Sequence, residues 1–200
     1  VPLHWEADGS FPNRPPDPLD ERGLAVLAKK VRASKASFGC SFDDDGDRVV
    51  FVDEEGNLVA PDFILALLAD HVLQRERGIV VAPVNASRIV KETVLDRGGQ
   101  VARSRVGWSF MTNKMQSLKA IIGGEISGHY YYREFFGGNS GLLTLFRVLN
   151  IYQHSQKPFS ELVLPYQKYF KTPEINFEKV HWLTLLPKLR HKYSDGQSDV

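Results

Sequence analysis

The chain has 200 residues, of which 42% are hydrophobic and 24% charged, and its formal net charge is +1. These values are typical of a globular protein, and no run of about 18 apolar residues predicts a membrane span. The small net charge gives no electrostatic reason to expect nucleic acid or a membrane as a partner. The single cysteine, Cys40, excludes an internal disulfide and no signal peptide is visible, so a cytoplasmic location is expected.

The first part of the chain is predicted to contain one helix and a small group of strands. A proline-rich stretch over 1–19 should be extended, and apolar residues at helical spacing predict a helix over 24–31. β-branched and aromatic residues predict strands over 37–42, 48–53 and 58–60, with a turn over 54–57 before the last.

From Pro61 onward, helical and strand patterns alternate. Helices are predicted over 61–77, 86–97, 109–117, 140–152 and 159–166. Strands are predicted over 79–84, 100–106 and 120–124, the last continued by the aromatic stretch 130–136. This alternation predicts an α/β fold, with a mixed, largely parallel sheet and flanking helices.

The acidic run SFDDDGDRVV, at 41–50, carries the strongest functional signal. Asp43, Asp45 and Asp47 are spaced by two residues, and clustered carboxylates repel one another unless a hard cation such as Mg²⁺ lies among them. Arg48 adds a guanidinium suited to phosphate. The alternatives are a solvated acidic turn and a calcium loop; the latter requires glycine at its sixth position, where this chain has Arg48.

Two further segments follow predicted strands. In GGEISGH, at 123–129, Glu125 and Ser127 would point the same way in extended backbone, and a carboxylate beside a hydroxyl suits a sugar diol. The alternative is a glycine-rich turn with an incidental glutamate. In RSRVGW, at 103–108, two arginines precede a predicted helix and could meet phosphate there, or form a solvated strand end.

Together, these segments resemble the α-D-phosphohexomutase family, specifically its phosphomannomutase/phosphoglucomutase branch. The resemblance rests on DGSFPN (8–13) with PDP (16–18), FDDDGDR (42–48), RSRVG (103–107) and GEISGH (124–129). It implies an enzyme that passes a phosphoryl group between a phosphoserine and a hexose phosphate, through a hexose 1,6-bisphosphate that also serves as activator.

The resemblance also implies roles for individual residues. It makes Asp43, Asp45 and Asp47 the Mg²⁺ ligands, Arg48 a phosphate-side contact, and Glu125 with Ser127 the residues that bind sugar hydroxyls. The catalytic candidates are Arg48 and His129, and Arg105 and Gly107 are further candidates for substrate binding. Trp108 and Asn85 stand where some relatives have a histidine and a lysine, so the general acid/base stays open.

The resemblance further predicts the domain organisation. Residues 1–57 would be the end of the family's second domain with the metal loop, 58–167 its third domain with the sugar loop, and 168–200 a linker toward a fourth. The first and fourth domains would belong to the same polypeptide outside this chain, and the isolated chain should be inactive. The alternatives are a phosphoglucosamine mutase, which Ile126 in the sugar loop favours less, and a non-catalytic module that binds sugar phosphate or metal. The preferred hexose and the oligomeric state stay open.

Overall fold

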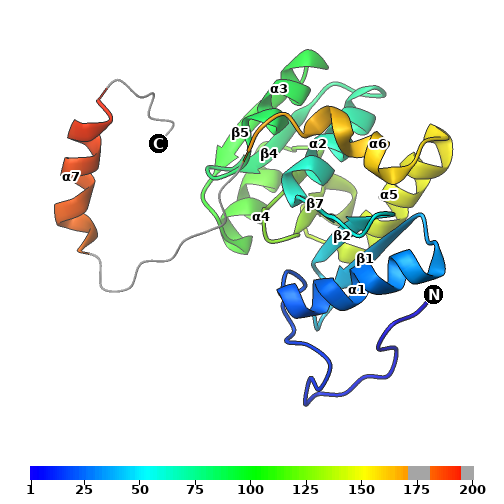
Figure 1. The fold of residues 1–200 in the computed structure, drawn as a ribbon. Helices are drawn as coiled ribbons and strands as arrows, with labels where there is room; N and C mark the ends of the chain where they lie inside the picture. The colour runs from blue at the N-terminus through cyan, green and yellow to red at the C-terminus, as the bar shows by residue number, and fades with distance from the viewer. Residues whose placement is uncertain (171–180, 195–200) are drawn as a thin grey trace. The chain divides into compact units, whose positions relative to one another are not determined.

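The computed structural model describes residues 1–170 and 181–194, and the chain divides into two compact units, Val1–Tyr169 and Phe170–Val200 (Figure 1). Each unit is considered by itself. The described part of the second unit contains α7 (Trp182–Lys192), a helix that the sequence pattern did not predict. The linker predicted over 168–200 lies partly outside the described residues.

The first unit begins with an irregular segment, followed by α1 (Glu21–Ser34). The Asp20 side chain caps this helix by accepting a hydrogen bond from the Gly23 backbone N–H at 3.2 Å, so the helix starts earlier than its apolar pattern predicts. Three strands then form an antiparallel sheet in the order β1-β2-β3: β1 (Phe38–Phe42), β2 (Val49–Asp53) and β3 (Leu58–Val59). These strands were predicted correctly.

Helix α2 (Pro61–Leu73) starts at the predicted proline but ends earlier than predicted. The prediction over 61–77 is wrong at the C-terminal end, because the Arg75 backbone N–H bonds to the carbonyl of Val72, three residues back. The residues after Leu73 are polar and mostly exposed, so they offer no apolar face that would keep the helix going.

A second sheet follows in the order β5-β4-β6-β7. Its strands are β4 (Ile79–Pro83), β5 (Gln100–Ser104), β6 (Ile122–Gly124) and β7 (Tyr130–Tyr132). The helices between and after them are α3 (Arg88–Asp96), α4 (Trp108–Ser117), α5 (Gly141–Ser155) and α6 (Phe159–Val163). Strand β4 pairs in parallel with β5 and β6, whereas β7 is antiparallel to β6. The predicted mixed, largely parallel sheet is therefore confirmed.

The aromatic stretch 130–136 does not continue β6 as predicted. The chain reverses between β6 and β7, and after Tyr132 it forms a 3₁₀ helix, Arg133–Phe135. A left-handed residue, Phe136, then turns the chain so that Asn139 pairs with Tyr131. The turn ends the strand after three residues, and it brings the start of α5 back toward the sheet.

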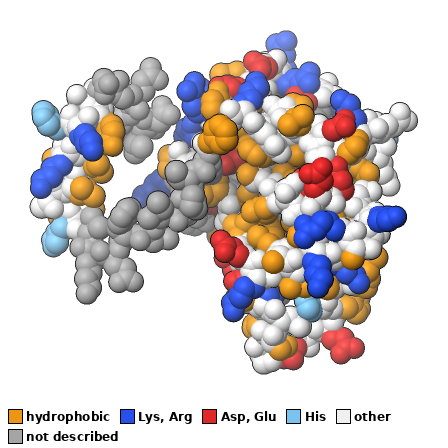
Figure 2. Space-filling view, viewed as in Figure 1, with side chains coloured by type: hydrophobic (Ala, Val, Ile, Leu, Met, Phe, Trp, Pro, Cys, Tyr) orange, Lys and Arg blue, Asp and Glu red, His pale blue; other side chains and the backbone are white. Residues whose placement is uncertain are grey.

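The second sheet is a middle layer between helices. Neighbouring residues of β4 face opposite sides: Val80 belongs to a core with α2 and α3, and Val81 packs with Met111 and Met115 of α4. The larger core also contains Phe51 of β2, so the two sheets share it. None of the helices within 1–170 and 181–194 combines the length and apolar character needed to cross a bilayer. On the face in Figure 2, acidic and basic side chains are interspersed.

Candidate functional site

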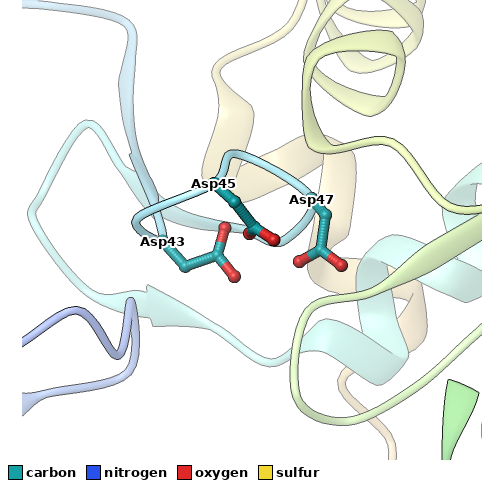
Figure 3. A group of neighbouring side chains, drawn as sticks. All are labelled: Asp43, Asp45 and Asp47. Carbon is teal, nitrogen blue, oxygen red and sulfur yellow. The ribbon is translucent and has the colours of Figure 1, made fainter.

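The acidic run forms the loop of the β1–β2 hairpin. Phe42 and Val49 are the last paired residues, and Gly46 turns the chain between them at φ +73°, a backbone angle that glycine adopts without strain. One oxygen each of Asp43, Asp45 and Asp47 lies within 4.8 Å of the others. Figure 3 shows the three carboxylates pointing into one space beside the loop. The predicted metal ligands are therefore brought together.

Arg48 holds the first carboxylate of this trio. Its backbone N–H donates to Asp43 Oδ1 at 3.0 Å and its Nε to Oδ2 at 2.7 Å. Burial by itself would raise the pKa of Asp43, but the hydrogen bonds from Arg48 outweigh it, so the pKa is lowered. Arg48 Nη1 lies 3.4 Å from Asp17 Oδ1, in the PDP motif. The guanidinium is thus fixed beside the trio.

The pKa of Asp47 is shifted in the opposite direction, upward. Burial and the nearby Asp43 carboxylate raise its pKa, and only part of this is offset by Asn139, whose Nδ2 donates to Asp47 Oδ2 at 2.7 Å. Asp47 therefore carries its negative charge less readily than Asp43, because the two carboxylates repel each other. An oxygen-preferring divalent cation would relieve this charge, so the donor set fits Mg²⁺.

The sugar-loop candidate, Gly124–His129, connects β6 to β7. Glu125 is 5% exposed; its Oε1 accepts from the Gly107 backbone N–H at 2.8 Å and its Oε2 from the Tyr131 hydroxyl at 2.6 Å. Burial would raise the pKa of Glu125, but hydrogen bonds from His129, Tyr131 and Gly107 outweigh it and lower the pKa. This carboxylate ties the loop after β6 to the start of α4.

His129 joins the acidic loop to the sugar-loop candidate. Its Nε2 lies 3.4 Å from Asp47 Oδ1, and its Nδ1 lies 3.4 Å from Glu125 Oε2 and 2.8 Å from Ser127 Oγ. The backbones also meet, because Arg48 and His129 form an isolated β-bridge. One imidazole therefore contacts residues from both motifs.

The remaining candidates lie in or beside the loops after β4 and β5. The loops after β4, β5 and β6 leave the same edge of the parallel strands, where open α/β sheets place ligands. Asn85, in the loop after β4, is exposed. The exposed Arg105 lies over the Phe110 ring, 4.5 Å from its centroid, and Arg103 donates to the Pro83 carbonyl at 2.9 Å. These arginines therefore contact protein groups.

Two residues that donate hydrogen bonds to Glu125 or Asp47 were not predicted as site residues from the sequence. Tyr131 lies in an aromatic stretch that suggested only packing, and Asn139 lies in a glycine-rich turn before α5. A polar residue directly before a helix is ordinarily interpreted as part of its cap. Here Ser140 caps α5, which leaves the Asn139 side chain available for Asp47.

Comparison with known proteins gives the chain a family. A family model described as "Phosphoglucomutase/phosphomannomutase, alpha/beta/alpha domain III" matches residues 60–169, and the model for domain II of the same family matches residues 1–56.

Individual relatives agree. The phosphomannomutase/phosphoglucomutase of Pseudomonas aeruginosa is 35% identical over 178 residues, which are 88% of this chain and 38% of the relative. The phosphomannomutase of Methanocaldococcus jannaschii is 33% identical over 189 residues, 94% of this chain and 42% of the relative. A crystal structure of a phosphoglucomutase/phosphomannomutase family protein from Burkholderia thailandensis superimposes with a TM-score of 0.87 at 33% identity, covering 96% of this chain and 41% of that one.

The chain thus spans about two-fifths of the length of these relatives. Because the domain III model alone matches more than half of the chain, and the matched segments contain the motifs that meet around His129, the chain belongs to the phosphoglucomutase/phosphomannomutase family, the α-D-phosphohexomutases.

Proposed function

We propose that this chain supplies the cation-binding and sugar-binding part of a phosphomannomutase/phosphoglucomutase. The enzyme would interconvert hexose 1-phosphates and hexose 6-phosphates through a phosphoserine and a hexose 1,6-bisphosphate. The observation that carries the proposal is the contact of His129 with both Asp47 and Glu125, at 3.4 Å each. It joins a set of carboxylates suited to a cation to a loop suited to sugar hydroxyls, as transfer of a phosphoryl group to a sugar requires.

In this proposal Asp43, Asp45 and Asp47 hold Mg²⁺, because their oxygens converge and carry excess negative charge. When bound, the cation would neutralise charge on the transferring phosphoryl group. Arg48 is held by Asp43, so its fork needs little reordering to meet a phosphate oxygen. Excess negative charge beside an anchored guanidinium is an arrangement suited to a phosphate ester and its cation.

His129 is the proposed proton carrier, because its two ring nitrogens face a carboxylate of each loop. Ser127, half-buried beside it, offers a hydroxyl to the sugar. Glu125 has already accepted two protein hydrogen bonds, but each carboxylate oxygen can accept a second one. That Glu125 reads sugar hydroxyls therefore stays a prediction.

The proposed cycle also needs a phosphoserine, which the resemblance assigns to a first domain, whereas the family models that match this chain are those of domains II and III. We therefore expect no mutase turnover from the 200-residue chain. The test adds glucose 1-phosphate, Mg²⁺ and a catalytic amount of glucose 1,6-bisphosphate to the purified chain, and measures glucose 6-phosphate with a coupled dehydrogenase. Formation of product above a protein-free blank would contradict the assignment of the phosphoryl carrier to another domain.

The proposal as a whole is tested in a polypeptide in which this chain is joined to a phosphoserine domain. There, Asp45→Asn should lower kcat by orders of magnitude while leaving the circular dichroism spectrum unchanged, because Asp45 is exposed and packs against little. Glucose 1-phosphate and mannose 1-phosphate are the substrates to compare. A polypeptide that binds these sugars but never turns them over would instead be a non-catalytic sugar-phosphate module.

A further inference from the structure

The side chain of Asn139 lies between two groups that leave its amide only one orientation. Trp108 Nε1 donates to Asn139 Oδ1 at 3.0 Å, and Asn139 Nδ2 donates to Asp47 Oδ2 at 2.7 Å. An indole N–H can only donate and an ionised carboxylate can only accept. Rotating the amide by 180° would lose both hydrogen bonds, so Trp108 and Asp47 favour the same orientation, with the Asn139 Nδ2 group toward Asp47.

We propose that Trp108 and Asn139 act as a positioning pair for the third carboxylate of the cation site. The inference rests on the proposed function, because it takes the aspartate trio to be a cation site. The two residues are 31 positions apart and meet because the start of α4 lies beside the turn before α5. The pair would act through Asp47, without itself contacting the cation.

The trio itself shows why one carboxylate needs this support. Asp43 is held by two hydrogen bonds from Arg48. Asp45 is exposed and, in the described part of the chain, has no side-chain hydrogen bond or ion pair. The side chain of Asp47 is 34% exposed; Asn139 donates a hydrogen bond to it at 2.7 Å, and His129 lies 3.4 Å from it. Two of the three carboxylates would then be set in advance, and Asp45 would close on the cation.

Both members of the pair are attached to fixed backbone. Trp108 is the first residue of α4, and the N–H of the preceding Gly107 is held by the buried Glu125. Asn139 forms a β-bridge with Tyr131, whose side chain is fully buried. Trp108 is 57% exposed, so burial of its ring stabilises the fold little, and removing the indole N–H should mainly affect the contact with Asn139. A hydrogen bond between groups on such rigid supports can orient a ligand.

Partners of metal ligands change metal affinity by about 10- to 100-fold when they are removed. We expect Asn139→Ala to weaken binding about tenfold, at the lower end of that range, because Asp47 keeps its contact with His129. Trp108→Phe keeps the ring but removes the N–H, so it should weaken binding by about threefold, since the amide stays but can rotate.

The experiment measures binding of Mn²⁺ alone to the 200-residue chain, from the electron paramagnetic resonance signal of free Mn²⁺. The double variant should bind no more weakly than Asn139→Ala, because Trp108 acts through Asn139. Asn150→Ala and Trp182→Phe, at exposed helical positions, are the matched controls and should leave the affinity unchanged. Melting temperatures of all variants should stay within about 2 °C of wild type.

A second readout follows Trp108 directly. In a Trp5→Phe, Trp182→Phe background, Mg²⁺ should shift the fluorescence of Trp108, and Asn139→Ala should remove that shift. Unchanged Mn²⁺ affinity in Asn139→Ala, or additive losses in the double variant, would overturn the positioning pair alone. Binding that Asp45→Asn also leaves unchanged would overturn the cation site, and with it the function on which the pair rests.

Discussion

Replacing Glu125 with alanine should destabilise the protein strongly, because this side chain joins three parts of the site. Its carboxylate is buried and accepts from the Gly107 backbone N–H and the Tyr131 hydroxyl, with His129 at 3.4 Å. Tyr131 is fully buried, so its hydroxyl would have no ready replacement acceptor after the substitution. The variant would leave two donors without their partner at once.

The expected loss follows from those two hydrogen bonds. A hydrogen bond to a charged group contributes about 1.5–3 kcal/mol, so two amount to about 3–6 kcal/mol. Removing a buried charge returns part of its desolvation cost, and water can reach the half-buried Gly107. We therefore expect Glu125→Ala to lower the free energy of unfolding by about 2–4 kcal/mol. In a chain of this size the melting temperature should fall by about 10 °C.

The assay is urea unfolding followed by far-ultraviolet circular dichroism. Glu76→Ala is the matched control, because Glu76 also accepts two hydrogen bonds, at 2.7 and 2.9 Å from Arg133, but is 45% exposed. That surface pair should cost about 0–1 kcal/mol. Equal losses in the two variants would refute the reasoning that burial makes the Glu125 contacts strong.

Three further predictions use the same geometry. The pKa of Glu125 is lowered in the folded state, so its contribution to stability is present above the unfolded pKa of about 4.3 and is lost as the pH falls through the folded pKa. In a plot of the urea midpoint against pH, Glu125→Gln should therefore reduce the fall in the midpoint on the acid side. Asp45→Asn should weaken Mg²⁺ binding at least tenfold by isothermal titration calorimetry, yet not lower the melting temperature without metal, because it removes a charge from a repelling group. A Cβ at Gly141 would lie 2.7 and 2.8 Å from two carbonyl oxygens of the metal loop. Gly141→Ala should therefore lower the free energy of unfolding in urea by about 1–3 kcal/mol and weaken Mg²⁺ binding. The control is Gly9→Ala, whose Cβ would have no atom within 4 Å and which should change neither.

The sequence by itself determined what is local. Periodicities of 3.6 and 2 residues predicted most helices and strands, because each pattern states which face of its own segment is apolar. The aspartate trio was also local: its three members fall within five residues of one loop, so their spacing alone brings the carboxylates together. Errors arose at the ends of elements: β7 stops at Tyr132 because the chain turns so that Asn139 can pair with Tyr131, and α2 stops at Leu73 because the residues after it are polar and exposed.

Only the tertiary structure decided which motifs meet, and through which atoms. Asn139 and Asp47 are 92 residues apart, and they touch because α5 begins beside the metal loop. Glu125 was predicted to face a sugar, but its position directly after β6 also lets it accept a hydrogen bond from the Gly107 backbone. Such contacts depend on where parallel strands end in space, and loops that leave the same edge of a sheet carry no shared pattern in the sequence.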